Sequence, residues 1–203
     1  KKFSKTPIEV IYRGLDFPEI KRKKQTSDVI SLGFIGRLVK LKGVDLLISA
    51  FADLIDEYPD LHLQIIGDGE ERQSLEKQVQ SLNIQDKVSF LGYKDKNTLQ
   101  NQILPSLDIF INPSQEGLPT TVIEALLAEC IVVATDVWGT REISDKSDFI
   151  LVQPDDPDAL IRGIRKALIQ LDAHWLSADA VREKFSRKKR ILQYANLYKL
   201  LCK

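Results

Sequence analysis

VISLGFIGRLVKLKGVDLLISAF, residues 29–51, contains one complete strand-to-helix unit. Its first part, Val29–Ile35, is a continuous apolar run that predicts a strand buried on both faces. Gly36-Arg37 ends this strand. The residues that follow predict a helix packed along one side, because their apolar positions recur at helical spacing up to Pro59-Asp60 (Val44, Leu47, Ile48, Phe51, Leu54, Ile55 and Tyr58).

The same alternation of strand and helix continues along the chain. Further strands are predicted at 61–66, 88–91, 108–111, 131–135 and 149–152, and helices at 70–82, 94–104, 119–128 and 157–171, with two more helical segments broken near Ser186. Such alternation indicates βαβ units and a mostly parallel sheet covered on both faces. We predict an α/β fold, a Rossmann-like doubly wound parallel sheet at 28–172, preceded by a basic linker at 1–27 with one possible strand and followed by C-terminal helices at 173–203.

The composition is that of an ordinary globular protein and excludes several classes. Of the 203 residues 43% are apolar, and 29 Lys and Arg balance 29 Asp and Glu. Zero net charge argues against a protein that coats nucleic acid, and no run reaches the ~20 apolar residues that a membrane helix needs. Cys130 and Cys202 are predicted to be reduced thiols of a cytoplasmic protein, and His62 and His174 to be structural. The chain contains no Met, so we interpret it as a fragment or a processed chain.

The loop after the first strand carries two cations at the edge where doubly wound sheets bind ligands, beyond the carboxyl ends of the strands. Arg37 offers a planar guanidinium and Lys42 a compact ammonium, and together they could neutralise a diphosphate. The alternative is a solvated loop, because charged loop residues are common. Both interpretations stay open on these two residues alone.

A second candidate site joins the strand at 108–111 to the helix at 119–128. The N–H groups at a helix start attract anions, and Gly117 lets a ligand approach the main chain. Glu116 lies before the helix and Glu124 one turn into it, so two carboxylates flank this anion-binding start. That layout suits a nucleotide sugar, because a carboxylate accepts hydrogen bonds from two adjacent hydroxyls. The alternative is a helix-start Glu together with an exposed helix Glu.

Six motifs in the right order resemble the C-terminal, nucleotide-sugar-binding half of the GT-B fold glycosyltransferases of the large retaining group called family 4 or group 1. The resemblance covers residues 31–170. The matching stretches are Gly36-Arg37-Leu38 with Lys42-Gly43, Pro59 with Ile65–Gly69, Val88–Gly92, Asp108–Ser114, Glu116–Pro119 with Glu124-Ala125, and Val132–Asp136 with Gly139 and Glu142.

The resemblance implies a role for each matching residue. Arg37 and Lys42 would hold the donor diphosphate and stabilise the leaving nucleotide diphosphate. Glu116, the first Glu of an E-x7-E motif, would bind hydroxyls of the donor sugar beside the reacting carbon, and Glu124 would bind the ribose. The catalytic set is therefore Arg37, Lys42 and Glu116. The other donor-binding positions are the main chain of Gly117, Leu118 and Pro119 around the sugar, Thr120 and Thr121 at the helix start, and Gly92 near the base.

The resemblance also implies the partners. A UDP- or GDP-linked sugar would be transferred with retention, as in polysaccharide biosynthesis, to a glycan or lipid-linked acceptor bound mainly by an N-terminal domain that this chain lacks. No metal, further cofactor or nucleic acid is implied, and peripheral contact with the inner face of the cell membrane is expected. We expect the isolated chain to bind donor weakly without turnover, and its last helix, at 191–201, to pack toward the missing domain.

The sequence departs from the family pattern at four places. The family commonly has Gly and Pro where this chain has Glu129 and Ile131. It usually has two small residues in place of Trp138-Gly139, and often Pro in place of Arg141. Trp138 could reshape the pocket floor or the acceptor side, while Glu142 could close the pocket or cap a helix. These departures leave the donor assignment in place but not the choice of sugar.

Two alternatives compete with a glycosyltransferase. The first is a nucleotide-sugar epimerase of the related two-domain fold, which would use a similar donor half. The second is a non-catalytic module that binds partners or anionic lipids through Lys21–Lys24, Ser186–Arg190 and the Tyr194/Tyr198 stripe.

Overall fold

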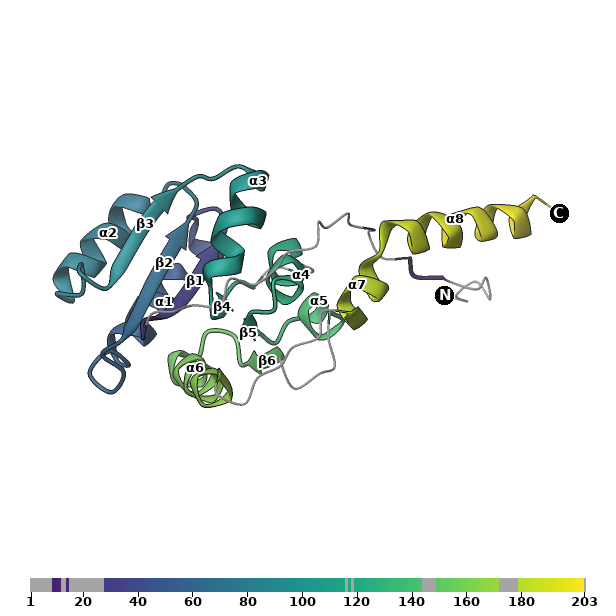
Figure 1. The fold of residues 1–203 in the computed structure, drawn as a ribbon. Coiled ribbons are helices and arrows are strands. Elements are labelled where there is room, and N and C mark those ends of the chain that lie inside the picture. The colour runs from purple at the N-terminus through teal and green to yellow at the C-terminus, as the bar shows by residue number, and fades with distance from the viewer. Residues whose placement is uncertain are drawn as a thin grey trace, which may run out of the picture.

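Six parallel strands form one sheet at the centre of the molecule (Figure 1). The computed structural model describes residues 9–11, 14, 28–115, 117, 119–143, 149–171 and 179–202. The strand order is β3-β2-β1-β4-β5-β6, and every neighbouring pair is parallel. The sheet confirms the predicted doubly wound α/β fold. The strands are β1 (Ile30–Ile35), β2 (Leu61–Ile66), β3 (Val88–Gly92), β4 (Ile109–Asn112), β5 (Ile131–Thr135) and β6 (Phe149–Val152).

The helices follow the predicted order with three differences, of which the first is a short helix, α5, that was not predicted. They are α1 (Val44–Ala52), α2 (Arg72–Ser81), α3 (Lys96–Thr98), α4 (Thr120–Leu127), α5 (Trp138–Arg141), α6 (Pro157–Leu171), α7 (Asp179–Phe185) and α8 (Arg187–Leu201). The helix predicted at 94–104 is instead three short pieces: α3, a π-helical segment η2 (Leu99–Ile103) and a 3-10 turn η3 (Leu104–Ser106). The helix predicted to reach Tyr58 ends at Ala52 and continues as turns, although Leu54 stays fully buried.

Each face of the sheet has its own hydrophobic core, because successive residues of a strand point to opposite faces. In β4, Ile109 and Ile111 pack into the core under α1, α2 and α6, whereas Phe110 packs into the core under α4 and α7. β5 divides in the same way. Burial on both faces explains why the strands read as uninterrupted apolar runs.

The strand order places a topological switch point between β1 and β4. From β1 the chain moves outward through β2 to β3 on one side, then returns to place β4 on the other side of β1. The loops after β1 and β4 therefore leave the sheet in opposite directions. Ligands of doubly wound sheets bind in the crevice that this divergence opens at the carboxyl edge.

The C-terminal helices α7 and α8 are separated at Ser186, as predicted, and α8 projects from the body of the molecule (Figure 1). Ser186 caps α8 by accepting a hydrogen bond from the Lys189 N–H. Gly14 of the entry segment lies so close to α8 that an added Cβ would come within 2.7 Å of the Arg187 Cα. The strand predicted at 8–12 and the rest of the linker fall largely outside the described residues.

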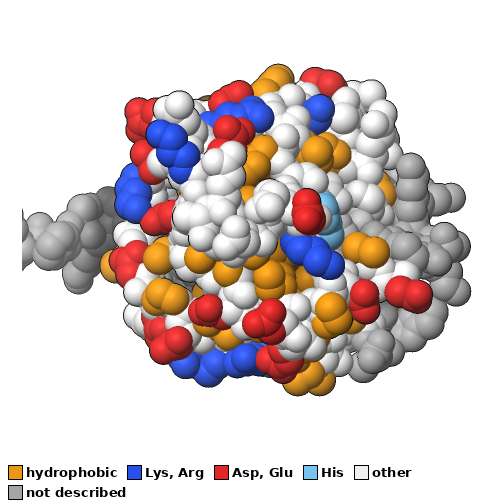
Figure 2. All heavy atoms as spheres, turned by 90° about the vertical axis from the view of Figure 1, so that its left-hand side faces the viewer, with side chains coloured by type: hydrophobic (Ala, Val, Ile, Leu, Met, Phe, Trp, Pro, Cys, Tyr) orange, Lys and Arg blue, Asp and Glu red, His pale blue; other side chains and the backbone are white. Residues whose placement is uncertain are grey.

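Several smaller predictions can be checked on the described residues. Cys130 is buried and Cys202 is exposed, and the structure pairs neither of them in a disulfide. The ring of His62 bonds Ser89 on the next strand at 2.9 Å, and burial lowers its pKa, which fits a structural role. Figure 2 shows acidic and basic side chains intermixed on the face at the β3 end of the sheet. Within the described residues no helix is long and apolar enough to cross a membrane.

Glu129 adopts a backbone conformation that favours glycine, which is the residue common in the resembling family. Its φ is 61°, and the N–H groups of Glu129 and Cys130 close the end of α4 by bonding the Leu126 and Ala125 carbonyls. These two bonds make a Schellman motif, whose left-handed position is usually Gly. The substitution Glu129→Gly should raise the free energy of unfolding by about 1 kcal/mol and the melting temperature by about 2–4 °C.

Calorimetric or fluorescence-monitored unfolding tests this prediction. Glu129→Ala is the matched control, because it removes the same carboxylate but keeps the Cβ that strains the left-handed conformation. The prediction fails if the Gly and Ala variants are equally stable.

Candidate functional site

The loops after β1 and β2 are joined by backbone hydrogen bonds at the carboxyl edge of the sheet. Gly36 N–H donates to the Ile66 carbonyl at 3.0 Å, and Leu38 N–H donates to the Asp68 carbonyl at 2.9 Å. Gly67 has a φ of 138°, and an added Cβ there would overlap the Gly36 carbonyl oxygen. A glycine is therefore needed for the two loops to touch.

The β1 loop also contacts the loop after β4. Gly43 has a φ of 64°, and an added Cβ would lie 2.9 Å from the Pro113 carbonyl oxygen. Gln115 N–H donates to the Leu41 carbonyl at 3.4 Å. Lys42 lies between these two contacts. The fold therefore brings Lys42 to the β4 side of the switch point.

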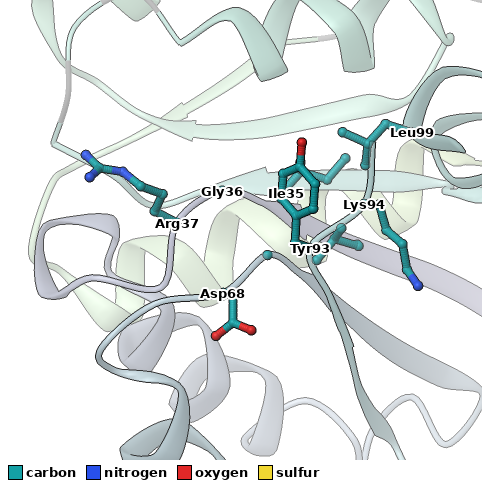
Figure 3. Close-up of a pocket in the computed structure, with 9 residues that line it drawn as sticks. Ile35, Gly36, Arg37, Asp68, Tyr93, Lys94 and Leu99 are labelled. Atoms are coloured by element: carbon teal, nitrogen blue, oxygen red, sulfur yellow. The ribbon is translucent and has the colours of Figure 1, made fainter. Parts of the chain in front are cut away.

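The two cations predicted to bind a diphosphate lie on this one loop. Arg37 directly follows the β1 end and is exposed, and Figure 3 shows its side chain extending away from the Tyr93 side of Gly36. Lys42 ends the 3-10 turn η1 (Lys40–Lys42) and is half-buried. The structure thus places one cation near β1 and the other near β4, on either side of the crevice.

The start of α4 supplies the second predicted part of the site. Pro119 is the N-cap of α4 in an extended conformation, and the half-buried Thr120 and Thr121 form its first turn. Gly117 is exposed, and a Cβ added to it would meet no atom of the described residues within 4 Å. Glu116 and Leu118 lie outside the described residues, so the predictions for them stay predictions.

Glu124 is half-buried, and a residue that the sequence did not reveal contacts it. Gln100, which is only 6% exposed, comes from the π-helical segment η2 and points its Nε2 at a Glu124 carboxylate oxygen 3.5 Å away. Burial raises the pKa of Glu124, while the bond from Gln100 and the positive charge of Lys96 act in the opposite direction. Burial of a carboxylate costs free energy, and a carboxylate buried one turn from a helix start is a typical feature of a binding site.

A cavity of about 250 Å³ opens beside the β1 loop (Figure 3). Its apolar lining comes from the ends of β1 and β2 and from η2, and the ring of Tyr93, which is 79% exposed, stands at its mouth. Such a small apolar cavity between polar loops suits one flat aromatic ring. Its lining is Ile35, Gly36, Arg37, Ile66, Gly67, Asp68, Tyr93, Lys94 and Leu99.

A larger cavity of about 470 Å³ lies at the carboxyl end of β5 and is lined by Asp136, Trp138, Arg141 and Glu142. Two guanidinium nitrogens of Arg141 donate hydrogen bonds to the Asp136 carboxylate, one of them at 2.6 Å. These bonds lower the pKa of Asp136. Trp138 is 94% exposed. Glu142 is the C-cap of the short helix α5, as one of its two interpretations predicted.

Sequence reasoning missed Gln100 and the contribution of η2 to the smaller cavity. Gln100 lies in a segment predicted to be a regular helix, and no sequence signal marks its π-helical turn. Leu99 looks like an ordinary helix residue until the loops come together. No three His, Cys, Asp or Glu side chains are grouped to hold a metal ion in the part of the chain that the structure describes.

Comparison with known proteins identifies the family. The family model described as "Glycosyl transferases group 1" matches residues 16–190. The chain belongs to this family. The group 1 resemblance stated from the sequence motifs is thereby confirmed, and the fold is that of the C-terminal half of a GT-B glycosyltransferase.

Individual relatives place this group 1 chain among longer proteins. It is 34% identical over 152 residues to a subunit of the human phosphatidylinositol N-acetylglucosaminyltransferase, covering 74% of this chain and 31% of that protein. It is 33% identical over 174 residues to an N-acetylgalactosaminyltransferase of Campylobacter jejuni that acts on a diphospho-undecaprenol-linked sugar, covering 82% and 46%. The chain therefore spans less than half the length of these two curated relatives.

Among solved structures, HepE of Anabaena in complex with UDP and glucose shares the fold of this group 1 chain. The TM-score is 0.80 at 22% identity, over 94% of this chain and 56% of HepE. At this level of identity the likeness establishes the fold alone.

Proposed function

We propose that this chain is the donor-binding half of a hexosyltransferase that uses a nucleotide diphosphate sugar. The observation that carries the proposal is the convergence at one switch point of the two cations, the start of α4, the Glu124 carboxylate with its buried partner Gln100, and a small apolar cavity. Each part matches one portion of such a donor. Family membership supports the reaction class.

The diphosphate lies between Arg37 and Lys42, with the N–H groups at the start of α4 on its other side. Bond cleavage at the sugar leaves negative charge on the departing diphosphate, and fixed cations and N–H dipoles aimed at that charge lower the barrier. Removal of one such group in the whole enzyme costs about 3–4 kcal/mol of activation free energy. We propose no metal ion or further cofactor for this step.

The two sugars of the donor are held by carboxylates. Glu124, kept in place by Gln100, accepts hydrogen bonds from the ribose hydroxyls, and Glu116 does the same for the transferred sugar beside its reacting carbon. The main chain at Gly117, Leu118 and Pro119 completes the sugar site. Retention of configuration rests on the family resemblance.

The base enters the cavity beside Gly92 and stacks near Tyr93, against apolar side chains that include Ile66. The cavity volume of about 250 Å³ and the presence of UDP in the HepE structure favour a uridine donor over a guanosine donor. A stack of this kind contributes about 1–3 kcal/mol per base.

The acceptor, a glycan or a lipid-linked sugar, is bound mostly by a preceding domain. Four apolar side chains on one side of α8 are 47–74% exposed and lie ready to contact that domain (Ile191, Tyr194, Tyr198 and Leu201). The same helix carries Lys188 and Lys189, which supports contact with an anionic membrane surface at the cytoplasmic side. Salt-sensitive co-sedimentation with anionic vesicles supports this contact, and binding that is absent or salt-insensitive contradicts it.

Calorimetric titration of the folded chain with UDP, GDP and their sugars tests the proposed function. We expect weak binding that is strongest for UDP compounds, without turnover. The absence of binding for every nucleotide, with the chain shown to be folded, contradicts the proposal.

Gly117→Ala separates the sugar portion of the donor from the nucleotide portion. Because an added Cβ meets no atom of the described residues, the melting temperature should stay unchanged. The Cβ should obstruct the sugar at the main chain and lower the affinity for a UDP-sugar about tenfold, a loss of about 1.4 kcal/mol, while UDP binds as before. Equal losses for UDP and UDP-sugar would place Gly117 against the phosphates instead.

A further inference from the structure

We infer that the cavity at the carboxyl end of β5 is a subsite for a neutral sugar ring of the acceptor, with Trp138 as its stacking platform. This inference rests on the proposed function, because it names the second substrate of the same reaction. The donor machinery does not use this cavity. Its lining residues are Asp136, Trp138, Arg141 and Glu142.

The exposure of Trp138 is the first observation. An indole that is 94% exposed keeps almost all of its apolar surface available for contact with a ligand. It lines a cavity of about 470 Å³, a size typical of small-ligand sites. The ring face is electron-rich and attracts the polarised C–H bonds on the apolar face of a pyranose.

The charges of the described residues that line the Trp138 cavity disfavour an anionic ligand. Arg141 is occupied by Asp136, and its two nitrogens bind both carboxylate oxygens, so this pair is neutral as a unit. The structure gives the Glu142 carboxylate no side-chain partner among the described residues. The described lining residues therefore carry one excess negative charge, which disfavours a phosphate or a nucleotide.

The same carboxylate suits a sugar. Glu142 can accept hydrogen bonds from two neighbouring hydroxyls, and the outer edges of the Asp136–Arg141 pair offer further acceptor and donor atoms. An aromatic ring contacts the apolar C–H face of a sugar, while a carboxylate and a guanidinium at its rim bond the hydroxyls along the edge of that sugar.

The position of the cavity relates it to the donor site. The Thr135 hydroxyl at the end of β5 donates to the Ser114 carbonyl in the loop after β4. In the same loop, Gln115 Nε2 donates to the Asp155 carboxylate at 2.5 Å, so the loop after β4 is held to the end of β5 and to the loop after β6. The Trp138 cavity thus lies one strand away from the start of α4, on the side opposite the base cavity. An acceptor sugar approaching the donor from β5 would cover Trp138.

The test uses the ¹⁵N-labelled full chain saturated with UDP, titrated with methyl glucoside, N-acetylglucosamine and N-acetylgalactosamine. We expect at least one sugar to shift the Trp138 indole N–H signal and the Glu142 amide with millimolar affinity that is insensitive to salt. Trp138→Ala should weaken this binding about tenfold or more without changing UDP affinity. Tyr198→Ala, which removes an exposed aromatic ring from α8, should leave it unchanged.

Three results would overturn the inference. In the first, none of the sugars shifts the Trp138 signal. In the second, Trp138→Ala and Tyr198→Ala behave alike. In the third, tetramethylammonium shifts Trp138 more strongly than any sugar in a salt-sensitive manner, which would make the cavity a cation site. If UDP does not bind, that result counts against the donor proposal alone. The sugar titration is then repeated without UDP and followed at the Trp138 signal, so the two proposals are tested separately.

Discussion

Replacement of Arg37 by Ala is expected to reduce the affinity of the chain for UDP by about 10- to 150-fold, with Lys42→Ala causing a similar loss. Each side chain supplies a charged hydrogen bond to the diphosphate, and such bonds contribute about 1.5–3 kcal/mol. Calorimetry with UDP measures the loss. Arg37→Lys should recover part of it, because the charge returns without the planar fork.

Lys40→Ala is the matched control for these variants. Lys40 lies on the same loop, but its ammonium is held by Asp45 at 2.5 Å and is proposed to play no part in binding. Its removal should leave UDP affinity unchanged within about twofold, since its charge is already balanced by Asp45 and is screened by solvent. If Arg37→Ala, Lys42→Ala and Lys40→Ala all weaken UDP equally, the loop acts only through its general positive charge.

Glu124→Gln should have opposite effects on stability and on binding. Burial raises the pKa of Glu124, so the folded chain holds this proton to higher pH than the unfolded chain does. The contribution of this carboxyl to stability is therefore present at acid pH and is lost as the pH rises through the raised pKa. At neutral pH the Gln variant, which carries no charge to bury, should melt at a higher temperature than the wild type.

Binding should change the other way, because the Gln side chain replaces a charged acceptor of the ribose hydroxyls by a neutral one. A loss of about 1.5–3 kcal/mol in UDP affinity corresponds to about 10- to 150-fold. Glu129→Gln, at the other end of α4, should bind UDP normally. A Glu124→Gln variant that is less stable than the wild type at neutral pH would contradict the account of this carboxylate.

Much of the fold could be predicted because a strand that is buried on both faces of the sheet appears in the sequence as a continuous apolar run. The strands at 61–66, 131–135 and 149–152 have the predicted bounds. β1 and β3 differ from the prediction by one residue at one end, and β4 by one residue at each end. Helix ends were predicted less well. The apolar spacing as far as Tyr58 reports which residues face the core, but the hydrogen bonding of α1 stops at Ala52.

The parts of the site that escaped prediction depend on contacts between distant segments. Gln100 meets Glu124 across 24 positions of sequence only because η2 winds as a π-helix. The cavity beside Tyr93 needs three strand ends to come together. By contrast, the departure at Glu129 was visible in the sequence, and the left-handed φ of 61° gives its physical meaning.

The central claim is that the crevice between β1 and β4 binds a nucleotide diphosphate. The most direct measurement is a titration of the ¹⁵N-labelled chain with UDP, followed by the amide signals of every residue. We predict binding with the largest shifts at Gly36, Lys42, Tyr93 and Thr120, which belong to the loops after β1 and β3 and to the start of α4. A folded chain that does not bind UDP at millimolar concentration, or one whose shifts lie away from this edge, would contradict the account.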